Sequence, residues 1–123
     1  MQAVLLTSVF ERQAKAAGLG DDEIQDIAVA VASNPLGGDL MVGTGGARKL
    51  RHAGRGEGKS GGYRTIHYFG GDDVPIFLLA LIDKGKRANL SQAERNDLAR
   101  TLPKIADAKD ADVEEWHGKY CAF

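Results

Sequence analysis

The order of hydrophobic and polar positions predicts a strand and two helices in the first third of the chain. Residues 4–10 (VLLTSVF) are apolar and partly β-branched, which favours a strand, and residues 11–17 (ERQAKAA) are rich in helix formers. A second helix is expected from Asp21, because apolar residues then recur at every third or fourth position as far as Val31. Pro35 ends this helix, since the residue before a proline resists the helical conformation.

Three strands are predicted in the middle of the chain, where most of the glycines lie. Residues 47–53 (ARKLRHA) alternate in the manner of a strand, and residues 63–69 (YRTIHYF) are aromatic and β-branched. Residues 75–82 (PIFLLALI) are apolar at successive positions, which is typical of a central strand covered on both faces. Consecutive strands with glycine-rich connections predict an antiparallel meander.

The last predicted helix begins after Ser91, which forms a capping-box pattern with Glu94. Pro103 is expected to kink or end this helix. The resulting order, β-α-α-β-β-β-α, predicts an α+β domain over residues 1–106. Residues 107–123 are acidic at first and aromatic at the end, and they are expected to form a separate C-terminal tail whose aromatic end docks on the domain.

Length and composition fit one globular domain that needs no membrane, metal or disulfide. The chain has 123 residues, of which 43% are hydrophobic and 27% charged, and its longest apolar run is far shorter than the about 20 residues that cross a bilayer. Cys121 is the sole cysteine, and the N-terminus lacks the pattern of a signal peptide. One cysteine and three scattered histidines do not supply the ligand spacing of a zinc site. A cytoplasmic protein without a cofactor is therefore expected.

The net charge of −1 hides a strong asymmetry along the sequence. Residues 21–46 contain acidic residues and no basic ones. Between residues 48 and 64, a single acidic residue, Glu57, stands among the basic residues Arg48, Lys49, Arg51, Arg55, Lys59 and Arg64. A basic centre between acidic flanks indicates a polyanionic partner, and the alternative is a solvated charged loop beside two acidic helices.

The sequence gives little support to nucleotide hydrolysis or to catalysis by histidine or cysteine. The run at residues 54–60 (GRGEGKS) looks like a phosphate-binding loop, but Ala53 stands where its first glycine is required and a strand follows where a helix should. His52 and His67 lie on predicted strands and are expected to be half-buried, hydrogen-bonded structural residues. Cys121 has no evident base beside it and is expected to be an ordinary tail residue.

Strand periodicity predicts that several basic residues meet on one surface. Lys49 and Arg51 are two positions apart, so they share a face of their strand, and Arg64 and Tyr68 share a face of the next. Lys84 follows the central strand directly. Such a surface suits a phosphodiester backbone, because arginine forks onto phosphate oxygens and tyrosine stacks or transfers protons. The alternative is that Arg64 and Tyr68 pair with the acidic start of the second helix.

Two runs of sequence make the chain similar to a known family. Residues 43–51 (GTGGARKLR) and residues 59–64 (KSGGYR), followed by the aromatic and apolar strands, resemble the HigB-like branch of the RelE/ParE toxin superfamily. The likeness in element order covers roughly residues 3–106. It implies a small α+β fold with a curved antiparallel β-sheet, an N-terminal helix pair and a C-terminal helix, and it places the helices on one side of the sheet.

The resemblance also implies an activity, partners and site residues. It suggests a toxin of a bacterial type II toxin–antitoxin system that cuts messenger RNA on the ribosome. The partners would be a cognate antitoxin, the ribosome and mRNA, with no membrane. Arg64 matches the arginine that the family ties to transition-state stabilisation. The other implied site residues are Arg51, Lys84 and Tyr68 for catalysis, and Arg48, Lys49, Lys59, Lys86 and Arg87 for RNA binding.

The implied chemistry requires no metal ion, because arginine, lysine and tyrosine together supply a base, an acid and positive charge for the phosphorane. Tyr68 stands in as the general base, since Tyr120, the tyrosine of the tail, lies beyond the matched region. The family often has an acidic or neutral turn after the last strand, whereas this chain reads Lys84-Gly85-Lys86-Arg87.

Two alternatives from other functional classes stay open at this point. One is a ParE-like toxin, which inhibits DNA gyrase and is not an enzyme; the other is an RNA- or protein-binding module without activity. For either toxin, an acidic antitoxin segment is the expected inhibitor of the basic surface. Its binding should weaken with added salt, whereas salt-independent binding would indicate a hydrophobic contact.

Overall fold

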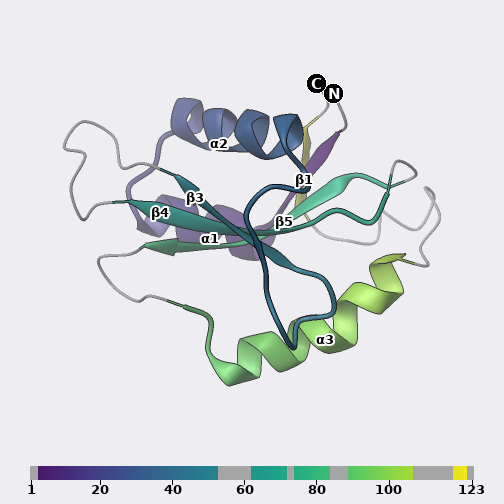
Figure 1. Ribbon diagram of the computed structural model, residues 1–123. Helices are drawn as coiled ribbons and strands as arrows, with labels where there is room; N and C mark the ends of the chain where they lie inside the picture. The colour runs from purple at the N-terminus through teal and green to yellow at the C-terminus, as the bar shows by residue number, and fades with distance from the viewer. Residues whose placement is uncertain (1–2, 53–61, 72–73, 84–88, 107–117, 122–123) are drawn as a thin grey trace.

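A computed structural model of the chain describes residues 3–52, 62–71, 74–83, 89–106 and 118–121. The helices are α1 (Ser8–Ala16), α2 (Asp21–Ser33) and α3 (Gln92–Ala106). The strands are β1 (Val4–Thr7), β2 (Asp39–Leu40), β3 (Arg48–His52), β4 (Tyr63–Tyr68), β5 (Ile76–Asp83) and β6 (Gly118–Cys121). These residues form a six-stranded sheet in the order β2-β3-β4-β5-β1-β6, with α2 above it and α3 below it in Figure 1.

The α+β class, the N-terminal helix pair and the C-terminal helix are confirmed. The predicted meander is present as β3, β4 and β5, which pair antiparallel in sequence order. The sheet as a whole is mixed, because β1 lies parallel to β5. Parallel strands need a long connection between them, and the segment between β1 and the meander contains the two helices α1 and α2.

The first strand is shorter than predicted, because Thr7 ends it and caps the helix that follows. Its Oγ1 accepts a hydrogen bond from the Phe10 amide (3.2 Å) and donates to the carbonyl of Leu78 in β5 (2.8 Å). Residues 8–10 therefore belong to α1, although their apolar, β-branched character favours a strand. A threonine in this cap position satisfies an amide that the first helical turn leaves free.

Helix α1 also protects the edge of β5. The pairing of β1 with β5 ends at Leu6 and Leu78, while β5 continues to Asp83. Beyond that point the side chain of Gln13 reaches the strand, and its Oε1 accepts a hydrogen bond from the Leu81 amide (2.8 Å). Buried backbone groups need such partners, so the polar Gln13 substitutes for a neighbouring strand.

Helices cover both faces of the sheet, which corrects the expectation that they lie on one side. One core, beneath α1 and α2, contains Leu78 and Leu81 of β5. The other core, which includes Leu102 of α3, contains Phe77 and Ile82. Strand β5 lies between β4 and β1 in the sheet. Its apolar side chains are covered on both faces by these two cores, as predicted for a central strand.

Helix α3 begins at the predicted capping box and continues past Pro103. The capping box is present, since Ser91 Oγ accepts from the Glu94 amide (3.2 Å) and Glu94 Oε1 accepts from the Ser91 amide (2.8 Å). Pro103 lies inside the helix, which continues to Ala106. Of the two expected outcomes, an end of the helix at Pro103 is therefore excluded.

The C-terminal segment contributes an edge strand. Strand β6 pairs antiparallel with β1, and Tyr120 lies opposite Leu5. The other two aromatic residues of the predicted tail, Trp116 and Phe123, lie outside the described residues. Among the residues that the structure describes, no helix has the length and apolar character needed to span a membrane.

Candidate nucleic-acid interface

Three basic side chains share one face of the sheet. Arg51 of β3 is the direct cross-strand partner of Arg64 of β4, and Lys49 is the partner of Ile66. Directly opposed residues of an antiparallel pair point to the same face, and so do residues two apart on one strand. Ile66 belongs to the core that includes Leu102 of α3, so Lys49, Arg51 and Arg64 all lie on the α3 side of the sheet. We call these three residues the basic face.

The basic face is accessible, and no described carboxylate forms an ion pair with it, although Asp39 of β2, the cross-strand partner of Lys49, lies on the same face. Arg51 is exposed, and Lys49 and Arg64 are half-buried. Within the described residues, none of the three side chains has a hydrogen bond or an ion pair. Like charges placed directly opposite each other destabilise a sheet. The arrangement fits a polyanion that would bridge the two guanidinium groups.

Tyr68 is on the same face but belongs to the core. Its side chain is 9% exposed and packs in the α3-side cluster. Glycines make room for its ring, since a Cβ on Gly70 would lie 2.9 Å from the Tyr68 Cε2 and one on Gly46 would lie 3.2 Å from its Cε1. Tyr68 and Arg64 are four residues apart on β4, which is about 13 Å along a strand. The structure thus places Tyr68 at the other end of β4 from Arg64.

The other predicted RNA-binding residues are not part of this arrangement. Arg48 points to the opposite face, where its Nη1 donates a hydrogen bond to the carbonyl of Leu36 (3.0 Å). The remaining site residues lie outside the described part of the chain, namely Lys59, Lys84, Lys86 and Arg87. Strand β5 ends at Asp83, which is the cross-strand partner of Tyr63.

The two histidines on the strands have structural roles, as predicted. His52 Nε2 shares a hydrogen bond with the Thr65 hydroxyl (2.8 Å), and His67 Nε2 donates to the carbonyl of Pro35 (2.9 Å). Burial lowers the pKa of both imidazoles. For His52, the charge that His67 carries when protonated lowers it further; for His67, the hydrogen bond to Pro35 raises the pKa and the nearby Arg48 lowers it. Both histidines lie on the face opposite the basic face. The cross-strand partner of His52 is Tyr63 and that of His67 is Arg48. These partners are next to Arg64 and Lys49 in sequence, and adjacent residues of a strand point to opposite faces.

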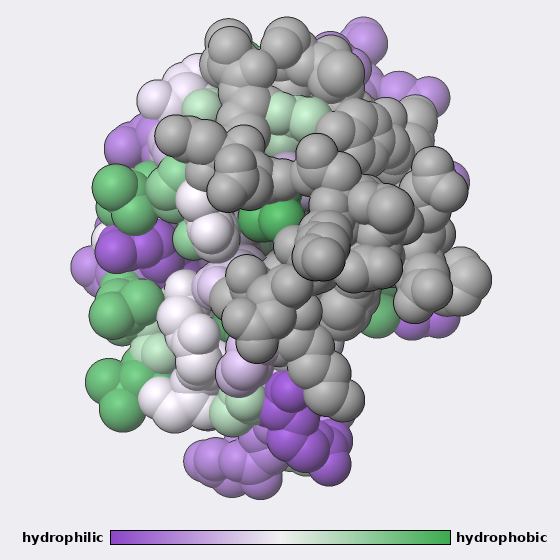
Figure 2. All heavy atoms as spheres, turned by 90° about the vertical axis from the view of Figure 1, so that its right-hand side faces the viewer, coloured by the Kyte–Doolittle hydropathy of each residue, from purple (hydrophilic) through white to green (hydrophobic). Residues whose placement is uncertain are grey.

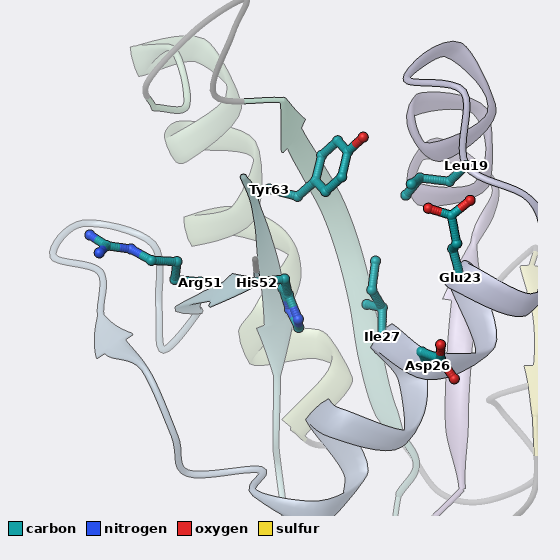
Figure 3. Close-up of a pocket in the computed structure, with 7 residues that line it drawn as sticks. All are labelled: Leu19, Glu23, Asp26, Ile27, Arg51, His52 and Tyr63. Carbon is teal, nitrogen blue, oxygen red and sulfur yellow. The ribbon is translucent and has the colours of Figure 1, made fainter. Parts of the chain in front are cut away.

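A pocket on the helix-pair side of the sheet was not predicted from the sequence. It has a volume of about 420 Å³ and is lined by Leu19, Glu23, Asp26, Ile27, Arg51, His52 and Tyr63. Figure 3 shows Glu23 and Tyr63 facing each other across it, whereas the side chain of Arg51 points away from the other six residues. Tyr63 and Arg64 are adjacent on β4, so their side chains point to opposite faces of the sheet. This alternation is the sequence signal that could have placed Tyr63 on the pocket side.

The pocket and the basic face lie on opposite sides of the sheet. The carboxylates of the pocket, Glu23 and Asp26, belong to α2 and lie on the opposite side of the sheet from Arg64. The alternative in which Arg64 and Tyr68 pair with the acidic helix is therefore wrong. A phosphate backbone would be repelled from the α2 side and attracted to the α3 side.

Comparison with known families supports the likeness seen in the sequence. The family model described as "RelE toxin of RelE / RelB toxin-antitoxin system" matches residues 2–119. Within the described residues, no group of histidine, cysteine, aspartate and glutamate side chains is placed to hold a metal ion. The match covers nearly the whole chain, including β1 at one end and the start of β6 at the other. The chain belongs to the RelE toxin family of toxin–antitoxin systems.

Proposed function

We propose that the protein is a metal-independent, ribosome-dependent endoribonuclease that cleaves mRNA and stops translation. The observation that carries the proposal is the pairing of Arg51 with Arg64 beside Lys49, on an accessible face where none of the three side chains forms an ion pair with a described residue. The assignment to the HigB-like branch rests on the sequence runs at residues 43–51 and 59–64.

The proposed reaction is transfer of the phosphoryl group to the neighbouring 2′-hydroxyl of the RNA. The O2′–P bond forms and the P–O5′ bond breaks, so that a 2′,3′-cyclic phosphate and a free 5′-hydroxyl result. The phosphorane that precedes bond cleavage carries extra negative charge on its non-bridging oxygens. Two forked guanidinium groups, Arg51 and Arg64, suit that charge, because each donates parallel hydrogen bonds to oxygen pairs.

Cleavage also requires two proton transfers. The 2′-hydroxyl must lose a proton and the 5′-oxygen must gain one. Lys84 follows β5 directly and is proposed for one of these transfers. Tyr68 stays a candidate for the other, although it lies about 13 Å from Arg64 along β4. We expect Lys84→Ala and Arg51→Ala to reduce cleavage less than Arg64→Ala, with losses divided between binding and rate.

The need for the ribosome follows from the chemistry of the basic face. Arginine and lysine side chains on strands attract phosphate, but they do not fix the angle between the 2′-hydroxyl and the P–O5′ bond. Orientation of the reacting groups supplies several kcal/mol of catalysis, about 7–11 in favourable cases. The A site would provide this orientation by holding the message in a defined conformation.

The test is message cleavage on purified ribosomes, read by primer extension. Ribosome-dependent cleavage that ends in a cyclic phosphate and is lost in Arg64→Ala is expected. A gyrase supercoiling assay runs in parallel. Intact message together with inhibited supercoiling would reject the nuclease in favour of a ParE-like toxin, and no effect in either assay would indicate a binding module.

A further inference from the structure

The pocket on the helix-pair side of the sheet joins apolar and acidic surfaces. Leu19 and Ile27 belong to the core beneath α1 and α2, and their exposed fractions are only 7% and 6%. They line the pocket together with Tyr63 and the carboxylates of Glu23 and Asp26. On the face shown in Figure 2, by contrast, hydrophobic groups along the left margin stand at the surface between hydrophilic ones. The pocket therefore offers a small ligand apolar surface and negative charge in one place.

Tyr63 and α2 form opposite walls of the pocket. Figure 3 shows Tyr63 and Glu23 facing each other across it, and the tyrosine is half-buried against the core. The volume of about 420 Å³ lies within the range of small-molecule sites, about 300–1,000 Å³. The face of an aromatic ring attracts a positive group within about 6 Å of its centre. A ligand between these walls would thus contact a ring on one side and a carboxylate on the other.

The two carboxylates are placed by the same helix but differ in what they do for it. Glu23 is in the first turn of α2, where its Oε1 accepts a hydrogen bond from the Gly20 amide (3.3 Å), so its position is fixed. Asp26 comes after the first turn, where the attraction of the helix dipole for a carboxylate fades. No described residue forms a hydrogen bond or an ion pair with the Asp26 side chain. Residues three apart are neighbours on a helix surface, so both carboxylates can reach one ligand.

Little positive charge from the described residues counters these carboxylates. Residues 21–46 contain no lysine or arginine, and the Arg51 side chain points away from the rest of the lining in Figure 3. Burial lowers the pKa of His52, so its imidazole stays neutral near neutral pH. Asp83, the cross-strand partner of Tyr63, adds a carboxylate on the same face of the sheet. The pocket would therefore attract a cation and repel an anion.

We propose that the pocket binds an organic cation that has a primary ammonium group on a short alkyl stem. An ammonium group has three donors on a compact centre and can serve both carboxylates, whereas a planar guanidinium forks onto one. The stem would pack on Leu19, Ile27 and the Tyr63 ring, as the hydrocarbon part of a lysine side chain does on apolar surface. Two sources supply this chemistry, namely a free alkyl diamine and a lysine side chain of a partner protein.

The test is titration of the full-length protein with 1,5-diaminopentane and, separately, with Nα-acetyl-lysine methylamide, followed by the amide chemical shifts in NMR. Saturable shifts are expected at Leu19, Asp26 and Tyr63. 1-Pentanol, which has the stem without the charge, should cause none. Tighter binding of the diamine would assign the pocket to a free diamine, and binding of the lysine derivative that is at least as tight would assign it to a side chain.

Substitutions in the pocket test whether its carboxylates hold the ligand. In Glu23→Gln/Asp26→Asn the affinity for the better probe should fall at least about 10-fold, which corresponds to about 1.4 kcal/mol. Glutamine keeps an oxygen for the Gly20 amide, so α2 should stay capped. The matched control, Asp21→Asn/Asp22→Asn, removes the same charge from the same helix outside the pocket lining and should bind as the wild type does.

The aromatic wall is tested by Tyr63→Leu, which keeps an apolar side chain and should weaken binding about 3-fold through the lost ring face. An equal loss of affinity in the pocket variant and its control would overturn the proposal, because it would indicate general attraction to an acidic helix. The absence of saturable shifts with both probes would overturn it as well. If the double variant fails to fold by circular dichroism, Asp26→Asn alone decides.

Cation binding and RNA cleavage can fail separately, since the pocket and the basic face lie on opposite sides of the sheet. A protein that binds the amine in the pocket but leaves mRNA intact would reject the nuclease and keep the pocket. Cleavage of mRNA by a protein that ignores both amines would do the reverse.

Discussion

Arg51 and Arg64 lie directly opposite each other on β3 and β4, with both side chains on the α3 side of the sheet. Two positive groups in this relationship repel each other, so the fold maintains the pair at a cost in stability. No carboxylate lies directly opposite either arginine: Glu23 and Asp26 line the pocket on the other side of the sheet, and Asp39 of β2 is the partner of Lys49. The pair is thus arranged for a ligand with negative charge.

Arg64→Ala should fold normally and lose mRNA cleavage by roughly 10²–10³-fold, the scale seen when one preorganised donor is removed from a transition state. Arg64→Lys should restore little, because an ammonium group does not reproduce the fork. Cleavage on ribosomes and growth arrest measure the effect, and circular dichroism checks folding. Arg12→Ala, which removes an exposed arginine from α1, is the control with the same charge change. A folded Arg64→Ala protein that still cleaves would remove Arg64 from the site.

Arg51→Glu should separate stability from activity. The new carboxylate would face Arg64 across the strands, so the free energy of unfolding should rise by about 0.2–1 kcal/mol relative to wild type. Cleavage should fall, because the phosphate would meet a negative group. Urea denaturation and the ribosome assay measure the two effects, with Arg12→Glu as the control of equal charge change. A destabilised Arg51→Glu protein would mean that the two arginines do not repel each other in the wild type.

Stability should decrease in mild acid through His67. Its imidazole is fully buried, its Nδ1 has no hydrogen-bond partner within the described part of the chain, and burial lowers its pKa from the ordinary 6.5. The unfolded chain binds this proton more readily than the folded one. The stabilisation is therefore complete above about pH 6.5 and is lost as the pH falls through the lowered pKa of the folded state.

The measurement is urea denaturation of wild type and His67→Gln at several values between about pH 7.5 and about pH 5. The wild type should lose stability toward acid more steeply than the variant. The lowered pKa of His52 acts in the same direction, and because His67 is one of its two causes, the difference in slope reports the two coupled histidines together. Equal slopes would show that His67 is protonated without cost.

Removal of the residues after Ala106 should lower the melting temperature by at least about 4 °C, the shift that about 1 kcal/mol causes in a domain of this size. The truncation removes β6 and leaves the outer side of β1 unpaired. Thermal denaturation of the full chain and the shortened chain measures the change. An unchanged melting temperature would mean that the pairing of β6 with β1 adds nothing to stability.

The elements that the sequence predicted well are those with a strong local signal. The α2 helix has a regular apolar face, and β5 is apolar throughout, so each could be assigned from its own residues. The end of β1 could not, because Thr7 caps α1 with help from the Leu78 carbonyl, which is far away in sequence. Strand β2 has two residues and exposed side chains, so it carries no pattern of its own.

The candidate site was predictable as far as alternation along a strand allows. The two-residue period put Lys49 with Arg51, and the register of β3 against β4 then brought Arg64 beside them. The register itself depends on the connection and on core packing, which periodicity does not reveal. The burial of Tyr68 depends on Gly46 and Gly70, which approach its ring from two segments of the chain. The pocket needs α2 over the strands, and this too is a tertiary relationship.

The position of β1 in the sheet has a consequence for the order in which the protein folds. Its two neighbours come late in the chain, since Val4 lies opposite Ile76 of β5 and opposite Cys121 of β6. Contacts between such distant residues form slowly, whereas β3, β4 and β5 are consecutive and can pair early. During synthesis the basic strands can therefore associate while the hydrophobic β1 still lacks both partners, and the sheet closes when nearly the whole chain has been made.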